Sequence, residues 1–392
     1  MRSSELDAVI ATTDVHSALG AFFSAVPHLH RSRSASLVVD CGDFFHGPAY
    51  AVTAGDVERR TLTALYDVLA VGNHGYDHHL VEPLRGLTVC ANVRLTSGDL
   101  LFRPVHVAVV AGRRVGVTGV IGERAFASVP NAQRAGHRWC DPAQALRRVH
   151  EEYQGQVDSW ILLSHSGFAA DLELTEQLPF LDVVFAGHCH SASYGPERAG
   201  RAVVVKGPER GRGFARAVWT GDGWDAESCV FPPQSGEVPD EVAPLLDDAA
   251  AVLQRLQAPL GPVDGRWLSR PLEAPVVAQA VAEAVAAVSG AAVAVNESAF
   301  RPVELGPVLR LHDVVHLAPY GNELLLVDAD PVGVRLLMER AVAATPSAAV
   351  AAPAGSQTGG VVVTDYLATR LGVEGQPAGL GFTEVVGRVL RS

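Results

Sequence analysis

The sequence has few cysteines, no long unbroken apolar run and no surplus of basic residues. Its five cysteines are irregularly spaced over 392 residues, which argues against a disulfide framework. The Ala/Val-rich stretch 276–295 is broken by Gln279, Glu283 and Ser289, so it does not predict a membrane-spanning helix. The N-terminus shows no basic region followed by an apolar region, as a secretory signal would. We therefore expect a cytoplasmic protein without a membrane partner.

The charge balance limits the partners further. Lys and Arg together number 31 and Asp and Glu 43, a formal net charge of −12. Because a nucleic-acid-binding surface normally needs a basic stripe, we do not expect a nucleic acid polymer as partner. A small phosphorylated substrate remains compatible, since bound metal ions supply positive charge that the residue count omits. With 48% hydrophobic residues the chain can form a large core, and its length favours two or three domains.

The first half alternates short apolar runs with helical stretches, such as 57–66 and 142–153, a pattern typical of a layered α/β domain. A basic, glycine-rich stretch at 203–220 lacks the order of a phosphate-binding loop, and we interpret it as a hairpin between two strands. Prolines and a glycine at 232–239 indicate a linker, and residues 343–360 a flexible segment. The predicted strands are 8–12, 36–39, 68–71, 114–120, 159–163 and 181–185, and the predicted domains are 1–235, a linker helix at 236–260 and a second domain at 261–392.

Polar clusters follow five of the predicted strands. Because the carboxyl ends of strands in an open α/β sheet converge on one edge, where ligands bind, we expect the clusters to share one crevice. A single Asp or His at such a place is more often a helix cap or a packed residue, as we interpret His28, His30, His78 and His79; His46, close to Asp43, stays open. The ordered set predicts a functional site. It comprises Asp14-Val15-His16, Asp40-Cys41-Gly42-Asp43, Gly72-Asn73-His74, Ser164-His165 and Gly187-His188-Cys189-His190.

The residue types indicate a metal centre. Imidazole, carboxylate and amide oxygen suit Zn, Mn or Fe(II), and the lack of a cysteine cluster argues against a closed structural zinc site. A carboxylate can bridge two cations. Two cations about 3.5–4 Å apart can stabilise both the attacking and the departing oxygen of a displacement at phosphorus. We therefore predict two divalent ions (Mn, Zn, Fe or Co) and phosphoester hydrolysis.

Two of these blocks carry a family resemblance. Asp40–Gly47 resembles the D-x-GD-xx-x-G motif, and Gly72–Asp77 the GNHEFD motif, of the calcineurin-like metallophosphoesterases and more narrowly the 5′-nucleotidases; residues 91–93 resemble a third block. The resemblance implies a two-sheet αββα sandwich followed by a second α/β domain. It implies one metal held by Asp14, His16 and His190, another held by Asn73, His165 and His188, a bridging Asp43, and a catalytic His74 oriented by Asp77.

Two positions depart from these motifs. Gly75 stands where GNHEFD has Glu, and the last block reads GHxH where nucleotidases often have GHxQ. Both catalytic and metal-binding residue types are otherwise present.

The C-terminal half resembles the nucleotidase specificity domain more weakly. Residues 296–301 align with its N-x-GGIR block, although Ser298 and Ala299 replace the glycines and the domain is shortened. The resemblance implies that Arg301 contacts an anionic group, that Tyr320 and Tyr366 flank a ring, and that Asn296 belongs to the same substrate site. Core packing is the alternative for Tyr320.

The predicted activity is hydrolysis of a nucleoside 5′-phosphate to nucleoside and phosphate. The altered C-terminal half favours a modified nucleotide from a specialised pathway, such as that of a nucleoside natural product. One alternative is a phosphodiesterase for cyclic or dinucleotides, or a phosphatase of a non-nucleotide metabolite. Another is a binding module without catalysis, against which the intact ligand set argues.

Overall fold

The computed structural model describes residues 6–191, 193–234, 236–268, 271–345, 347–353 and 359–391. They form two compact units, residues 1–252 and 253–392, and the division falls inside helix α8 (Ala243–Gln257). Helix α8 lies in the stretch where the sequence predicts a linker helix. No helix among the described residues is long and apolar enough to cross a membrane.

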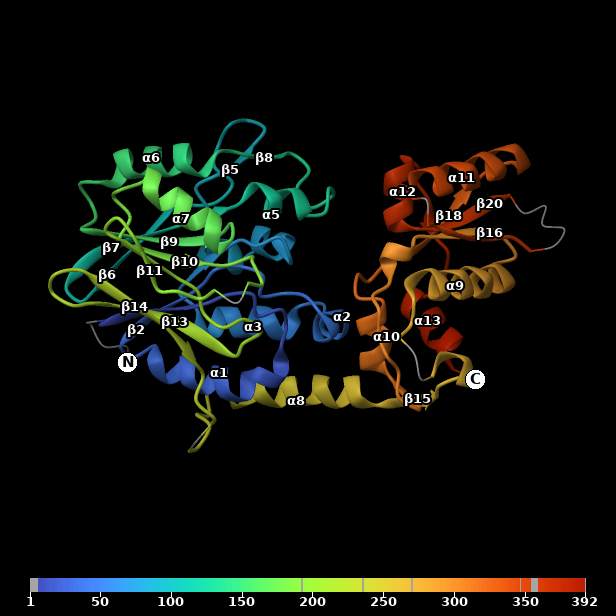
Figure 1. The fold of residues 1–392 in the computed structure, drawn as a ribbon, viewed down its shortest axis with the longest axis horizontal. Coiled ribbons are helices and arrows are strands. Elements are labelled where there is room, and N and C mark those ends of the chain that lie inside the picture. The colour runs from blue at the N-terminus through green and yellow to red at the C-terminus, as the bar shows by residue number, and fades with distance from the viewer. Residues whose placement is uncertain are drawn as a thin grey trace. The chain divides into compact units, whose positions relative to one another are not determined.

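The first unit contains two six-stranded sheets (Figure 1). In one, β1, β2, β3 and β4 run parallel, and β13 and β14 add an antiparallel edge. Its spatial order is β14 (Trp224–Val230), β13 (Gly213–Trp219), β1 (Ala8–Thr12), β2 (Ser36–Asp40), β3 (Val68–Ala70) and β4 (Thr88–Val89).

In the second sheet β7, β9, β10 and β12 are parallel neighbours, with antiparallel strands at both edges. Its spatial order is β11 (Glu197–Ala199), β12 (Ala202–Val205), β10 (Val183–Ala186), β9 (Ser159–His165), β7 (Arg113–Ile121) and β6 (Val105–Val110).

Helices cover the outer faces of the paired sheets, α1 and α3 on one side and α6 and α7 on the other (Figure 1). Strand β9 shows why the sheets pack so: Ile161 and Leu163 join the core between the sheets, whereas Trp160 and Leu162 face the α6–α7 layer. A strand buried on both faces needs apolar residues at every position. The αββα sandwich predicted from the sequence is confirmed. The principal helices are α1 (Leu19–Ser32), α3 (Asp56–Leu65), α6 (Pro142–Tyr153) and α7 (Phe168–Gln177).

Shorter elements complete this unit. Helix α6 begins at the predicted residue because the Asp141 carboxylate caps the Gln144 N–H at 2.8 Å and Pro142 occupies the first turn. The remaining elements are α2 (Pro48–Thr53), the 3₁₀ helix η1 (Tyr76–Leu80), α4 (Leu84–Leu87), α5 (Glu123–Ser128), and a ribbon of β5 (Val93–Leu95) and β8 (His137–Trp139).

The hairpin predicted at 203–220 is wrong. Strand β12 pairs with β10 and β11 in one sheet, whereas β13 pairs with β1 and β14 in the other. Residues 206–212 therefore cross from sheet to sheet and close the sandwich. Alternation along a strand reports its two faces but not which strand becomes its neighbour.

The second unit is a five-stranded sheet between two helical layers. Helices α9 and α13 share a core with one face, and α11 and α12 with the other. The predicted flexible segment contains β19, and its residues 354–358 lie outside the described residues. The sheet order is β19 (Ala349–Ala351), β16 (Ala292–Val295), β20 (Gly360–Thr364), β18 (Leu324–Asp328) and β21 (Gln376–Pro377).

The helices of this unit are α9 (Ala274–Ser289), α10 (Leu311–Leu317), α11 (Pro331–Ala344), α12 (Asp365–Leu371) and α13 (Phe382–Leu390), with 3₁₀ turns η2 (Gly265–Trp267) and η3 (Glu297–Ala299). A separate ribbon joins β15 (Pro259–Pro262) to β17 (Val308–Arg310).

Candidate metal centre

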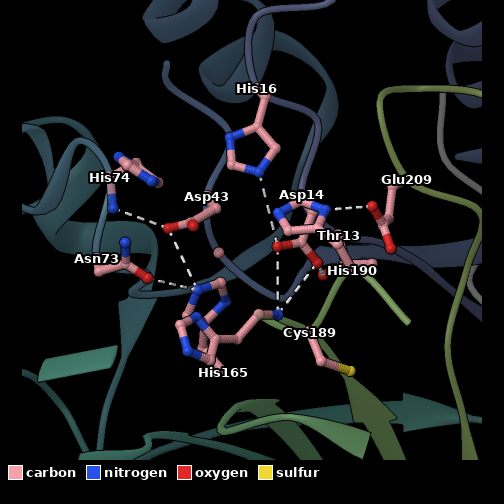
Figure 2. Close-up of polar contacts among 12 residues, drawn as sticks. Thr13, Asp14, His16, Asp43, Asn73, His74, His165, Cys189, His190 and Glu209 are labelled. Atoms are coloured by element: carbon pink, nitrogen blue, oxygen red, sulfur yellow. Dashed lines mark hydrogen bonds and ion pairs between the residues drawn. The ribbon is translucent and has the colours of Figure 1, made fainter. Parts of the chain in front are cut away.

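The predicted polar clusters meet at one edge of the sandwich (Figure 2). The parallel strands β1, β2 and β3 of one sheet and β9 and β10 of the other end there. The structure brings together the eight residues predicted from strand ends: Asp14, His16, Asp43, Asn73, His74, His165, His188 and His190.

A first donor group consists of Asp14, His16 and His190, with one potential ligand atom from each lying within 4.8 Å of the others. Asp14 is fully buried and is held from two sides. The Thr13 hydroxyl donates to its Oδ2 at 2.6 Å, and the His188 backbone N–H contacts both carboxylate oxygens at 3.1 and 3.2 Å. The first and last sequence clusters are thus joined directly.

A second donor group consists of Asp43, His165 and His188. The His165 Nδ1–H donates to the Cys41 carbonyl at 2.8 Å, which leaves Nε2 directed toward Asp43 Oδ1 and the Asn73 side-chain oxygen, each 3.3 Å away. A hydrogen bond that fixes one ring nitrogen is the usual means of presenting the other to a cation. Cys41 contributes through its carbonyl, while its thiol is buried.

A third donor group includes His46, whose role the sequence analysis left open. His46, His74 and His16 also bring ligand atoms within 4.8 Å of one another. The His46 and His74 rings are stacked at a tilt, with centroids 4.0 Å apart. His16 belongs to both this group and the first. Proximity of His46 to Asp43 in the sequence was the only signal available for it.

The backbone around the groups is strained. Nine described non-glycine residues have positive φ angles, and six of them belong to these loops. Such angles cost about 1–3 kcal/mol each and persist only where the surroundings impose them, often at functional sites. The six are Asp14, His16, Ser17, Asp43, His46 and His188.

Two glycines are required by close packing. A Cβ on Gly72 would lie 2.0 Å from Asp43 Oδ1, so only glycine allows this carboxylate its position. Gly75 has φ +71°, and a Cβ there would lie 2.4 Å from the Phe45 ring. The Phe45 ring therefore leaves no room for the glutamate side chain that GNHEFD has at this position.

Burial and mutual charge set the protonation of the site. Burial lowers the pKa of His16 to about 3 and of His188 to about 4, although the negative charge of Asp43 offsets part of the lowering in both. Burial would also lower the pKa of His165, but the Asp43 charge and hydrogen bond raise it to about 9. Burial would raise the pKa of Asp43, yet His165 holds it below its ordinary value. The site thus contains neutral imidazoles and an ionised carboxylate, and a cation would compete with the proton on His165.

The donor set fits divalent transition metals. Both ring nitrogens of His16 are buried and have no hydrogen-bond partner among the described residues, an arrangement that costs free energy unless a ligand occupies them. Imidazole nitrogens and carboxylate oxygens are ligands of Zn, Mn, Co and Fe(II).

Asp77 lies on η1, three residues after His74 in the sequence. It lines a cavity of about 630 Å³ with Arg59 and His78, and its Oδ1 is buried and accepts no hydrogen bond from the described residues. Its predicted role in orienting His74 stays a prediction.

The predicted substrate residues lie in the second unit. Arg301 is exposed and donates to the Tyr320 hydroxyl at 3.0 Å, with its guanidinium over that ring. Tyr320 and Tyr366 are 51% and 43% exposed, which removes core packing as an explanation for Tyr320. Asn296 instead is buried: its Oδ1 accepts from Thr364 at 2.6 Å and its Nδ2 donates to Ser298. Its contacts make it a support for the loop.

Comparison with known proteins agrees with this geometry. The profile of the family described as calcineurin-like phosphoesterase matches residues 8–192. A probable 5′-nucleotidase of Treponema pallidum is 28% identical over 247 residues, which cover 57% of this chain and 41% of that protein. Human 5′-nucleotidase is 29% identical over 189 residues, covering 44% and 32%. The matched region thus spans about two fifths or less of these curated relatives.

The fold agrees over a longer stretch. The crystal structure of a 5′-nucleotidase precursor from Thermus thermophilus superposes with a TM-score of 0.66 at 20% identity, covering 98% of this chain and 96% of that one. The resemblance drawn from the motifs is confirmed. Residues 8–192 thus match the calcineurin-like phosphoesterases, and the chain is similar in sequence and in fold to 5′-nucleotidases.

Proposed function

We propose that the chain is a metal-dependent phosphomonoesterase that releases phosphate from a nucleoside 5′-phosphate or a modified nucleotide. The observation that carries the proposal is a pair of adjoining donor groups, each with a carboxylate and two imidazoles. They lie beside His74 at the edge of the sandwich where the parallel strands end. Two close divalent cations are suited to displacement at phosphorus.

Asp14, His16 and His190 would hold one ion, and Asn73, His165 and His188 the other, with Asp43 between them. The ions would neutralise phosphoryl charge and lower the pKa of water. The chain's own contribution is to fix the donors before substrate arrives. The buried Asp14 and Asp43 carboxylates and the Cys41 carbonyl hold the surrounding groups in place.

His74 is the residue proposed to act on the phosphoryl group. Its backbone N–H donates to Asp43 Oδ1 at 2.8 Å, and its ring centroid lies 5.5 Å from that of His16. A ring so placed can stabilise the transferring group and donate a proton to the leaving oxygen. Asp77 would orient the ring.

Recognition of the nucleoside part is assigned to the second unit. Arg301 supplies a guanidinium, and Tyr320 and Tyr366 supply exposed rings. Their segments are joined: the Glu323 N–H donates to Asp365 at 3.3 Å, and the Asp365 N–H donates to the Glu323 carbonyl at 2.9 Å. The replaced glycines and the shortened domain support a modified nucleotide rather than a common one.

Phosphate release tests this function. We expect the Mn²⁺-supplemented chain to release phosphate from nucleoside 5′-monophosphates faster than from cyclic nucleotides, dinucleotides or sugar phosphates. Preference for a diester would favour the phosphodiesterase alternative, and hydrolysis of sugar phosphates alone would remove the nucleotide from the proposal.

Arg301→Ala is expected to raise KM for the preferred nucleotide about 10- to 100-fold, the range for loss of charge-assisted hydrogen bonds. Hydrolysis of a small aryl phosphate should barely change, because that substrate needs only the metal centre. Steady-state kinetics on both substrates measure the effect, with Arg335→Ala, at an exposed arginine of α11, as the control. Equal loss on both substrates would mean that Arg301 supports the fold instead.

A further inference from the structure

The crossover at residues 206–212 contacts both loops of the first donor group. The Arg210 backbone N–H donates to the Asp14 carbonyl at 2.8 Å. Glu209 Oε2 contacts His190 Nδ1, and the Lys206 ammonium donates to the carbonyl of the neighbouring Cys189. One segment therefore links the loop of Asp14 to the loop of His190.

Lys206 and Glu209 also form an ion pair with each other. Glu209 uses one oxygen for His190 and the other for the Lys206 ammonium; Figure 2 shows Glu209 beside the His190 ring. The Lys206 side chain is 0% exposed and that of Glu209 7% exposed, whereas His190 is half exposed. The buried ion pair of Lys206 and Glu209 thus contacts His190, which is the most exposed of the candidate metal ligands.

The composition makes Lys206 unusual. It is the only lysine in the sequence, and every other residue in the combined Lys and Arg total is an arginine. Burying an ammonium costs free energy unless it is paired and hydrogen-bonded, and Lys206 has both the Glu209 carboxylate and the Cys189 carbonyl. A compact ammonium fits a closed space in which the planar fork of arginine would need more room.

We propose that Lys206 and Glu209 are positioning residues that hold His190 for the metal ion of the first donor group. Glu209 fixes Nδ1 of His190 and leaves Nε2 as the nitrogen available to a cation, and Lys206 holds the Glu209 carboxylate in place. Carboxylates that hold ligand histidines typically change metal affinity about 10- to 100-fold. The inference rests on the metal-dependent function proposed above.

The test is a calorimetric titration of the metal-depleted full chain with Mn²⁺. The double variant Lys206→Met/Glu209→Leu removes both charges together, so the fold should hold. We expect one of two binding events to weaken about 10- to 100-fold, while the other event and the melting temperature of the metal-depleted chain stay as in the wild type. Turnover should recover in excess Mn²⁺, because the defect is in affinity.

The matched control is Arg216→Met/Glu227→Leu, which removes an exposed ion pair of 3.3 Å on the β13–β14 hairpin and should leave both binding events unchanged. Wild-type Mn²⁺ affinity in the Lys206/Glu209 variant would overturn the inference, as would a loss of turnover that excess Mn²⁺ does not restore. If that variant does not fold, Glu209→Gln gives the decision, since unchanged affinity there contradicts the role. A wild-type chain that binds no Mn²⁺ would instead refute the proposed function itself.

Discussion

His74→Asn is expected to lower kcat about 10²–10⁴-fold, the usual contribution of a positioned acid, while both metal ions stay bound. The contact between His74 and Asp43 uses the His74 backbone N–H, which asparagine retains. The substitution therefore removes the ring without disturbing the carboxylate. Asp77→Asn should give a smaller loss of the same kind, since Asp77 acts through the ring.

Turnover and metal content of the same preparation measure this effect. The control is His78→Asn, because His78 packs on Phe45 with ring centroids 4.2 Å apart and lies outside the three donor groups. Loss of a metal ion in His74→Asn would show that His74 is a ligand. A similar fall in His78→Asn would show that loop packing, rather than the His74 chemistry, was disturbed.

Metal removal should abolish activity, and Mn²⁺, Co²⁺ or Zn²⁺ should restore it better than Mg²⁺. The two proposed sites contain four imidazoles, whereas Mg²⁺ prefers oxygen ligands in octahedral geometry. Chelation, removal of the chelator and addition of each ion separately measure the preference. Best recovery with Mg²⁺ would contradict the nitrogen-rich donor set proposed here.

The meeting of the candidate ligands at one edge was predictable because these residues follow local rules. Each candidate ligand comes at or directly after a buried strand, and parallel strands bring their carboxyl ends to one edge. Apolar runs identify such strands, as for β1, which spans the predicted residues 8–12. The start of helix α6 was equally predictable, because Asp141 and Pro142 mark its first turn.

The contacts that support the ligands were not predictable in this way. Glu209 reaches His190 only because β12 and β13 belong to different sheets, and strand partners depend on packing far along the chain. The same choice of partner made the predicted hairpin wrong. The sequence shows glycine at position 75, but the Phe45 ring that excludes a larger side chain there lies thirty positions earlier in the chain.

The central claim is that two metal ions per chain support phosphate release. The direct measurement titrates Mn²⁺ into the metal-depleted chain and records bound metal and nucleotide hydrolysis in the same samples. We expect negligible hydrolysis without metal and full activity only as bound Mn²⁺ approaches two ions per chain. Full activity in the metal-depleted chain, or a maximum at one ion per chain, would contradict the two-metal centre.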